Sequence, residues 1–421
     1  MDKANIRHLI GFAEAVRLRS ISGAAASVGR TQPALSHAIH TLEDDFGASL
    51  FHRGRAGVTS TEAGNALAIR VTALILRLRN AFADALKKDR DEAQRIVHGL
   101  TSGQLRALFA VDQQQSFAGG ARAFGIPAPN LHRSINELEQ KLGVELFEKA
   151  NFGARSTQAG AQLAFETGLA FRELRQARDE IARIVGAAGG ETRIGAMPFA
   201  RAYIAPMATT LFLREYPNYN IAIIEAPYEV LVRDLRRGAV DFLIGAERGE
   251  MSGAGTIEER ILQDELSLLM RPDHPLMSER VLSRKVLAVY PWITPRISSP
   301  LRRQVESLLG AAPVSAIECN SYSAARIVLM NSDTLMLLSK AQARLDIDSG
   351  LISARTLPGK KLARSIVLSY RSDWNPTERQ SALLQQVRSL AATSSSSGHT
   401  PRALYAKKGA ERKARRQYSE R

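Results

Sequence analysis

Apolar residues near the N-terminus recur at the spacing of an amphipathic helix. Leu35, Ile39 and Leu42 lie four and three residues apart, which places them on one face of a helix. A shorter, alanine-rich segment precedes them and ends at Gly29, a residue type that readily adopts the left-handed turn between two helices. The pattern therefore predicts a helix, a tight turn, a second helix and then a wing over residues 20–64.

The polar face of the second helix has the chemistry that base recognition requires. Thr31 is expected to cap this helix, and Pro33 is tolerated because it lies in the first turn. The side chains opposite the apolar stripe are donors and acceptors that can reach base edges in the major groove. Together with the basic wing, the predicted DNA-binding residues of this stretch are Arg30, Thr31, Gln32, Pro33, Ser36, His37, His40, Arg53 and Arg55.

The whole pattern recurs 96 residues further along the chain, with no gap. Pro33 recurs as Pro129, and the pair Leu50-Phe51 recurs as Leu146-Phe147. Two unrelated helical segments would not keep glycines, a proline and this apolar pair in one register. The sequence therefore predicts a tandem duplication, with a first repeat over residues 1–65 and a second, degenerate repeat over residues 101–160.

The two repeats differ at the positions that would touch DNA. Thr31-Gln32 corresponds to Pro127-Ala128, so the second repeat lacks the hydroxyl cap and the amide that can pair with adenine. Its basic residues for contact with phosphates are Arg133, Lys149 and Arg155. Two interpretations remain open from the residues alone: the second repeat contacts the DNA backbone, or it serves as a dimer or spacer module.

A linker helix is predicted after each repeat, over residues 66–100 and 161–189. Residues 62–98 are rich in Ala, Leu and Arg and lack proline, which favours one long helix that ends near 87–90 and restarts toward Gly99. The second linker helix carries apolar residues at the 4-3-4-3 spacing of a coiled-coil seam, namely Ala170, Leu174, Ala177, Ile181 and Ile184.

From Thr192 onward the pattern changes to alternating strands and helices. Short apolar strands at 193–196, 221–225 and 241–245 are separated by helical segments, which predicts a parallel sheet with right-handed crossovers. Apolar runs at 266–270, 292–293, 316–318 and 335–338 predict a second sheet, and residues 365–370 return as another strand. The expected fold class is multidomain, α followed by α/β.

These segments resemble those of a known family. Residues 31–37 (Thr-Gln-Pro-Ala-Leu-Ser-His), Leu50-Phe51 and residues 61–64 (Thr-Glu-Ala-Gly) are similar to the winged helix-turn-helix of LysR-type transcriptional regulators. In the C-terminal half, residues 241–245 (Asp-Phe-Leu-Ile-Gly) and 290–296 look most like the galactose-binding-protein regulator branch of that family. The usual LysR pattern has one winged domain, so the second repeat departs from it.

The resemblance implies a fold and an assembly. Residues 190–392 would form an effector-binding domain similar to type 2 periplasmic binding proteins, with lobe I over 190–262 and 343–392 and lobe II over 263–342. The helix over 161–189 would pack against the same helix of a second subunit, in a homodimer or homotetramer. Residues 393–421 carry eight Lys or Arg against two Glu and are expected to be a disordered basic tail.

The implied effector cleft lies where strands of the C-terminal half end and helices begin, the usual place for ligands on such sheets. Arginines there suit a bidentate pair with a carboxylate, whereas Phe199 and Tyr322 suit stacking on an apolar or sugar face. A monosaccharide would use Glu225, Asn320 and Ser321 as hydrogen-bond partners. The candidate effector-binding residues are Pro198, Phe199, Ala200, Arg201, Glu225, Ala246, Arg248, Pro295, Arg296, Ser298, Asn320, Ser321 and Tyr322.

Composition narrows the list of partners and excludes several classes of protein. The net charge of +15 favours an anionic partner, nucleic acid before membrane. The single cysteine, Cys319, excludes a disulfide within the chain and fits a reducing cytoplasm. No secretion signal, membrane span, metal-ligand cluster, phosphate loop or nucleophile–base pair stands out, so we expect no cofactor, no metal and no catalysis.

These expectations define the functional hypothesis. The chain is predicted to be a cytoplasmic, non-enzymatic, LysR-type DNA-binding transcriptional regulator that responds to a sugar or to a small organic or aromatic acid. Its expected partners are double-stranded promoter DNA, the effector and further copies of itself, with RNA polymerase as a further candidate and no membrane. The alternative is an architectural DNA-binding protein with a vestigial effector cleft, which ligand-dependent thermal stabilisation would distinguish.

Overall fold

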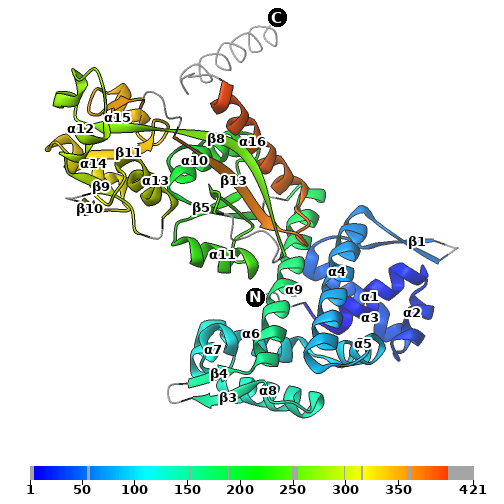
Figure 1. Ribbon diagram of the computed structural model, residues 1–421. Coiled ribbons are helices and arrows are strands. Elements are labelled where there is room, and N and C mark those ends of the chain that lie inside the picture. The colour runs from blue at the N-terminus through cyan, green and yellow to red at the C-terminus, as the bar shows by residue number, and fades with distance from the viewer. Residues whose placement is uncertain are drawn as a thin grey trace, which may run out of the picture. The chain divides into compact units, whose positions relative to one another are not determined.

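The computed structural model describes residues 4–54, 57–150, 153–187, 189–248, 255–297, 299–313, 316–357 and 362–396 (Figure 1). The contacts divide the chain into two compact units. The first unit holds most residues up to Thr192, and the second holds most residues from Arg193 onward. In the described ranges, no helix is long and apolar enough to cross a membrane.

Three helices and a hairpin form the first repeat. They are α1 (Ile6–Leu18), α2 (Ile21–Ser27), α3 (Gln32–Phe46), β1 (Phe51–Gly54) and β2 (Gly57–Ser60). Leu35, Ile39 and Leu42 of α3 are each at most 1% exposed and belong to the same core as Phe12. The predicted helix, turn, helix and wing are therefore confirmed for this repeat, and Gly29 has the expected positive φ of 64°.

The second repeat has the same elements at equivalent positions. They are α6 (Ser102–Gln114), α7 (Phe117–Phe124), α8 (Ala128–Leu142), β3 (Phe147–Ala150) and β4 (Gly153–Ser156). Its hairpin pairs Phe147 with Ser156, as the first hairpin pairs Phe51 with Ser60. The glycines that end α3 and α8 have φ angles of 66° and 70°. The periodicity of the sequence is therefore matched by a periodicity of the backbone.

Two long helices follow the repeats, and they pack side by side (Figure 1). α4 (Glu62–Leu86) follows the first repeat and α9 (Gln158–Ile184) follows the second. The predicted helix over 62–98 is divided as expected. α4 ends at Lys87, which has a left-handed φ of 53°, and α5 (Arg90–Gly99) restarts with the side chain of Asp89 as its N-cap.

The apolar seam of α9 is covered within the same chain. Ala170, Leu174, Ala177 and Ile181 are at most 2% exposed and share one core with α4 residues such as Leu74. The expectation that this seam packs against the same helix of a second subunit is therefore wrong, because α4 already occupies it. Periodicity identified the buried stripe but carries no information on which helix covers it.

A mixed sheet organises the second unit. Among the described residues its strand order is β10 (Ala316–Glu318), β9 (Trp292–Thr294), β11 (Leu335–Ser339), β8 (Thr256–Met270), β13 (Ala363–Arg371), β7 (Phe242–Ala246), β5 (Glu191–Ala196) and β6 (Asn220–Ile224), with β12 (Ser353–Arg355) paired to β8. β5 and β7 are parallel, but β13 is antiparallel to both β7 and β8. The predicted parallel sheet is corrected to a mixed one, because β13 returns from late in the chain to lie between β7 and β8.

The long strand β8 joins the two lobes of this unit. Its residues 256–265 pair with β13, and its residues 266–270 pair with β11 and β12. The predicted second sheet is therefore continuous with the first. Sequence analysis found only residues 266–270 of this strand, because residues 256–265 include several charged side chains and lack an apolar run.

Helices flank the strands of the second unit. They are η1 (Ala200–Ile204, a π-helix), α10 (Ala205–Glu215), α11 (Tyr228–Arg236), the 3-10 turn η2 (Pro275–Met277), α12 (Arg284–Ala288), α13 (Pro300–Leu309), α14 (Tyr322–Met330), α15 (Arg344–Asp348) and α16 (Glu378–Ser396). The predicted tail is helical over residues 393–396, where α16 ends. Its remaining residues, 397–421, lie outside the described residues.

Candidate DNA-binding surface and effector cleft

The polar face of α3 is exposed to solvent because the opposite face packs into the core. The predicted contact residues on this face and just before the helix fall into two groups by exposure. Arg30 and Ser36 are half-buried, and the exposed ones are Thr31, Gln32, Pro33, His37 and His40. Proline in the first turn does not interrupt the helix, since no intrahelical partner exists for its missing amide. The exposed face is therefore a polar surface on a rigid helix, as major-groove recognition requires.

Thr31 lies at the N-cap position of α3, but its hydroxyl makes no capping hydrogen bond. The predicted capping role is corrected accordingly, and the exposed hydroxyl lies next to Gln32 in sequence. Further along the helix, the ring of His40 is 3.8 Å from the carboxylates of both Glu43 and Asp44, too far for a hydrogen bond. Thr31 and His40 are therefore loosely held, which suits side chains that must adapt to a ligand.

A small hollow beside α3 collects basic side chains. It has a volume of about 220 Å³ and is lined by Arg7, Ile10, Val28, Gly29, Arg30 and His98. The pKa of the neighbouring His8 is lowered by burial and then by the positive charges of Arg30 and His37. This surface is therefore electrostatically positive, which favours an anionic partner.

The matching helix of the second repeat presents a different polar face. Arg133 on α8 is 81% exposed, and its Nε donates to Glu137 Oε1 at 2.7 Å. The ring of His132 stacks on Phe117 with centroids 4.2 Å apart. A guanidinium held by one surface ion pair can exchange that pair for a DNA phosphate at little cost.

The wings are described only in part. Arg155 is exposed on β4, as phosphate contact requires. The side chains of Arg53 on β1 and Lys149 on β3 lie outside the described residues, as does the whole of Arg55. Their predicted contacts with DNA stay predictions.

A cleft of about 430 Å³ opens in the second unit. Its walls come from the segments that follow β5, β6, β7 and β9, from the segment between β10 and α14, and from α13, β11 and β13. Because several of these segments lie at strand ends, the cleft is where the resemblance implied a ligand site. The predicted effector-binding residues that line it are Pro198, Phe199, Glu225, Ala246, Arg248, Pro295, Arg296, Asn320 and Tyr322.

Two of the other predicted cleft residues, Ala200 and Ser321, are not among its lining residues. Ala200 is fully buried within the π-helix η1, and the Ser321 side chain caps α14 by accepting from the amide of Ala324. These two predictions are corrected, since both residues serve the start of the following helix. The side chain of Arg201 and the whole of Ser298 lie outside the described residues.

Several lining residues escaped the sequence analysis. Arg364 comes from β13, Gln304 from α13 and Tyr228 from the first residue of α11. Only the pairing of β13 with β8 brings Arg364 to the cleft, and no local pattern marks it. Tyr228 directly follows a proline in a predicted cleft loop, so an aromatic residue at that position was a usable signal. The further lining residues that the sequence analysis did not place in the cleft include Glu229, Leu301, Cys319, Met336, Leu338 and Gln342.

The charge of Arg364 is already matched inside the unit. Its Nε lies 2.9 Å from Asp264 Oδ2, and its Nη2 donates to Gln342 Oε1 at 2.7 Å. Burial raises the pKa of Asp264, and the charge of Arg364 opposes that rise. Arg364 therefore forms a fixed wall of the cleft.

Some shielded polar atoms of cleft residues have no hydrogen-bond partner in the described part of the chain. They include Arg248 Nε and Gln304 Oε1. Arg248 lies over the ring of Tyr228, 4.2 Å from its centroid, and its Nη1 is 3.7 Å from the exposed Glu229. An unsatisfied buried polar atom costs about 1–3 kcal/mol. A ligand that offers both an acceptor and a hydroxyl group would relieve both costs.

The cleft residues that follow β9 and begin α14 are held by local hydrogen bonds. Arg296 is exposed, and its backbone amide donates to Asn320 Oδ1 at 3.3 Å. The hydroxyl of Tyr322 donates to Asp346 Oδ2 at 2.7 Å, and burial together with this carboxylate raises the pKa of Tyr322. Tyr322 is therefore a neutral, fixed side chain, whereas the Arg296 guanidinium is free to reorient toward an anion.

Reactive and metal-binding side chains are sparse. Cys319 is half-buried, and its thiol donates to the carbonyl of Ser321 at 3.3 Å. Within the described ranges, no group of three or more His, Cys, Asp or Glu side chains is arranged to hold a metal ion. Hydrogen bonding and ion pairing are thus the chemistry that the described cleft residues offer.

Two family models match the chain. The model described as "LysR substrate binding domain" matches residues 186–392. The model described as "Bacterial regulatory helix-turn-helix protein, lysR family" matches residues 6–65 and again residues 102–161. The first model covers the unit with the cleft, and the second model matches both repeats.

Individual relatives and solved structures agree with these matches. The chain is 27% identical over 394 residues to the HTH-type transcriptional regulator GalR of Pseudomonas putida, which covers 93% of this chain and 98% of that protein. It is 28% identical over 291 residues to the HTH-type transcriptional regulator PcaQ of Agrobacterium fabrum, covering 68% and 94%. A full-length OxyR variant of Pseudomonas aeruginosa has a TM-score of 0.53 at 22% identity, covering 69% of this chain and 95% of that one, which supports the fold alone.

Proposed function

The chain belongs to the LysR family of transcriptional regulators, and from this premise we propose that its first repeat reads promoter sequence while its cleft senses a small molecule. It is a DNA-binding regulator and not an enzyme. The observation that carries the first part is the exposed polar face of α3, where Gln32 and His37 stand opposite a buried stripe. A glutamine at this end of a recognition helix can pair with adenine in the major groove.

The second repeat is, in this proposal, a diverged copy of the same winged domain. The double match of the helix-turn-helix model and the equal hairpin registers support this assignment. The alignments to GalR and PcaQ span 394 and 291 residues, a difference close to the spacing of the repeats. Since Ala128 replaces the base-reading glutamine, the proposed role of this copy is contact with the phosphate backbone through Arg133 and Arg155.

The cleft is proposed to bind a small organic anion that also carries a hydroxyl group. Arg248 and Arg296 would hold the carboxylate, and Gln304 and Asn320 would bond to hydroxyls. Sugars, which offer hydroxyls without a carboxylate, are the second class within the proposal. An aromatic or apolar body would fit against the apolar side chains of the wall, which include Phe199, Leu301, Met336 and Leu338.

Calorimetry on the full-length protein with a panel of hydroxylated aromatic acids, aliphatic acids and monosaccharides tests the cleft. Arg248→Ala is expected to weaken acid binding about 10- to 100-fold, because a charge-assisted hydrogen bond is lost. Arg296→Ala should likewise reduce acid binding while only weakening sugar binding. Gln304→Ala should weaken hydroxylated acids more than the same acids without the hydroxyl.

A matched control and a clear negative complete this test. Arg344→Ala removes a surface arginine of α15 that pairs with Asp348 and does not line the cleft, so it should bind like the parent protein. If no compound of the panel binds and none raises the melting temperature, the cleft is vestigial. The alternative of an architectural DNA-binding protein would then replace the effector proposal.

The rest of the proposal concerns assembly and place of action. LysR regulators bind DNA and form oligomers, and we propose a homodimer or homotetramer of this chain, acting in the cytoplasm and contacting RNA polymerase at the promoter. The lone half-buried thiol of Cys319 is compatible with a reducing compartment. Sedimentation equilibrium of the full-length protein measures the number of chains per particle, and a monomer at all concentrations would refute the oligomer.

A further inference from the structure

Two equivalent ion pairs join the long helices of the first unit. Arg70 Nη1 on α4 lies 3.1 Å from Glu173 Oε2 on α9, and Arg77 Nη1 on α4 lies 2.6 Å from Glu166 Oε2 on α9. At the 96-residue spacing of the repeats, Arg70 corresponds to Glu166 and Arg77 corresponds to Glu173. Each ion pair therefore joins the same two positions of the repeat. In one pair the first position comes from α4 and the second from α9, and in the other pair the reverse holds.

The order of contacts along the helices shows that α4 and α9 are antiparallel. Glu62 at the start of α4 lies 3.5 Å from Arg183 near the end of α9. Further along α4, Arg77 meets Glu166, which is closer to the start of α9. Two equivalent helices packed antiparallel are related by a local two-fold axis, and such an axis generates each contact twice.

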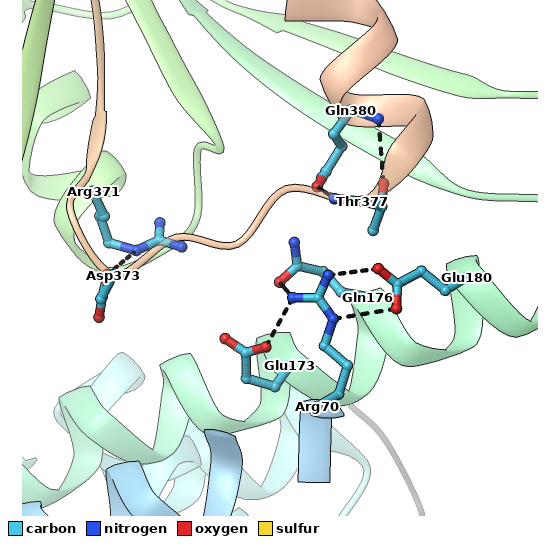
Figure 2. A network of polar contacts seen from close by, with 8 residues as sticks. All are labelled: Arg70, Glu173, Gln176, Glu180, Arg371, Asp373, Thr377 and Gln380. Atoms are coloured by element: carbon cyan, nitrogen blue, oxygen red, sulfur yellow. Dashed lines mark hydrogen bonds and ion pairs between the residues drawn. The ribbon is translucent and has the colours of Figure 1, made fainter. Parts of the chain in front are cut away.

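Arg70 is the centre of a buried cluster (Figure 2). Its side chain is 1% exposed, Nη1 also donates to Gln176 Oε1 at 3.3 Å, and Nη2 donates to Glu180 Oε1 at 2.6 Å. Burial disfavours its charged form, but the hydrogen bonds and charges of Glu180 and Glu173 outweigh burial and raise the pKa of Arg70. A guanidinium removed from water in this way needs acidic partners on the facing helix.

At the positions of these two ion pairs, the charges oppose pairing between like helices. In the same antiparallel geometry, two α4 helices from different chains would bring Arg70 against Arg77 twice. Two α9 helices would bring Glu173 against Glu166 twice. Like charges in a partly buried interface are costly because the low dielectric strengthens their repulsion. Only a mixed pair, one helix from each repeat, sets opposite charges against each other at both places.

We propose that this charge pattern makes α4 pair with α9 of the same chain. A single chain then forms one DNA-binding unit that carries two recognition helices. The inference rests on the proposed duplication and goes beyond it, since it removes the linker helices from any contact between subunits. The two recognition helices, α3 and α8, carry different polar faces. One chain is therefore expected to bind an asymmetric pair of half-sites instead of an inverted repeat.

Charge reversal at the less buried ion pair tests, in the full-length protein, whether α4 pairs with α9 of the same chain through these charges. Arg77 and Glu166 are 15% and 25% exposed, so their reversal leaves no fully buried charge. Arg77→Glu and Glu166→Arg should each lower the melting temperature of the first unit by about 3–6 °C. The double variant in one chain restores opposite charges and should recover most of that loss. As a control, Arg17→Glu reverses the exposed partner of Glu14 inside α1 and should shift melting by less than about 2 °C.

A mixture of the two single variants distinguishes pairing within a chain from pairing between chains. The proteins are unfolded together, refolded and melted. If α4 pairs with α9 of another chain, the reversed helix of each variant meets the reversed helix of the other, and stability returns. If the pairing is within one chain, the mixture stays as unstable as its components, which is the expected result.

Two outcomes would overturn the inference. Recovery in the mixture would assign the α4–α9 contact to different chains, and failure of the double variant to recover would remove the charge pattern as its cause. Because the readout is stability and not DNA or effector binding, either result leaves the proposed function standing.

Discussion

In both repeats, the amide that precedes the first strand donates to a glutamate carboxylate of the recognition helix, at 2.8 Å in the first repeat and 2.7 Å in the second. The threonine that caps the following long helix also repeats its hydrogen bonds. The exposed start of the recognition helix does not repeat, since Gln32 is replaced by Ala128. The two repeats thus share these backbone contacts and a similar core, while their exposed side chains differ.

The long helices show the same division. Their N-capping threonines, Thr61 and Thr157, correspond, but the first repeat carries arginine where the second carries glutamate. This difference in charge makes the two corresponding helices complementary to each other. The comparison teaches that two helices of similar backbone can be made complementary by charged side chains alone.

The largest expected effect is on stability, and it tests whether the backbone is packed equally tightly at Gly64 in the first repeat and at Gly160 in the second. A Cβ at Gly64 would lie 2.1 Å from the carbonyl oxygen of Leu50, and at Gly160 it would lie 2.0 Å from that of Leu146. Gly64→Ala and Gly160→Ala should therefore each reduce the free energy of unfolding by roughly 3 kcal/mol. Urea unfolding followed by circular dichroism measures the loss.

The control for this pair is a glycine with room around it. A Cβ at Gly103 on α6 would meet its nearest atom at 3.7 Å, so Gly103→Ala should be neutral or slightly stabilising. A mild effect at Gly160 beside a severe one at Gly64 would show that the second repeat packs more loosely than the first.

The second prediction concerns the two ion pairs, which should contribute differently to stability because they are buried to different extents. Arg70→Met leaves the 8%-exposed Glu173 side chain without its charge partner and should cost about 3 kcal/mol. Arg77→Met removes the more exposed partner of Glu166 and should cost about 1 kcal/mol or less. Equal losses in urea unfolding would mean that the buried cluster adds nothing to the pair itself.

The third prediction separates base reading from phosphate contact. Gln32→Ala should cost about 1–3 kcal/mol at the cognate site and little on random DNA. Arg133→Ala should weaken binding to every sequence and reduce the salt slope by about one unit. Fluorescence anisotropy at several salt concentrations measures both. An equal loss on random DNA for the first variant contradicts base reading, and an unchanged slope for the second means that its arginine does not contact phosphate.

The smallest effect concerns pH and only the first repeat. Its His8 corresponds to Gln104 of the second repeat. Burial, then the charges of Arg30 and His37, lowers the pKa of His8 below the reference value of 6.5, so the unfolded state binds the proton more readily. This contribution to stability is therefore fully present above pH 6.5 and declines as the pH falls below it.

His8→Gln, which copies the second repeat, should reduce the difference in melting temperature between about pH 7.5 and about pH 5.5. The direction is the same for His98, whose pKa burial also lowers. An unchanged pH difference in the His8 variant would assign the acid sensitivity to other groups such as His98.

Residues that act locally were predictable. The stripe of Leu35, Ile39 and Leu42 was identified because helix periodicity alone decides which face avoids water. Gly29 was identified because few other residues tolerate its φ of 64°. Residues at strand ends, such as Pro198 and Asn320, were placed in the cleft because the alternation of strands and helices implies where those ends gather.

Residues that act at a distance were not predictable. Arg364 and Gln304 line the cleft only because β13 inserts beside β8 and because α13 packs near it. The polar first part of β8 was missed for a related reason, since its strand conformation is imposed by pairing with β13. Strand pairing across a hundred residues leaves no mark on local periodicity.

The sequence by itself determined that the stripe from Ala170 to Ile181 must be buried, and that the chain contains its winged pattern twice. Only the tertiary structure decided that α4 of the same chain buries that stripe. The physical reason is that apolar burial has no direction and accepts any partner of suitable shape. The choice of partner depends on charges such as those of Arg70 and Glu173, which reveal their complementarity only when the two helices are set side by side.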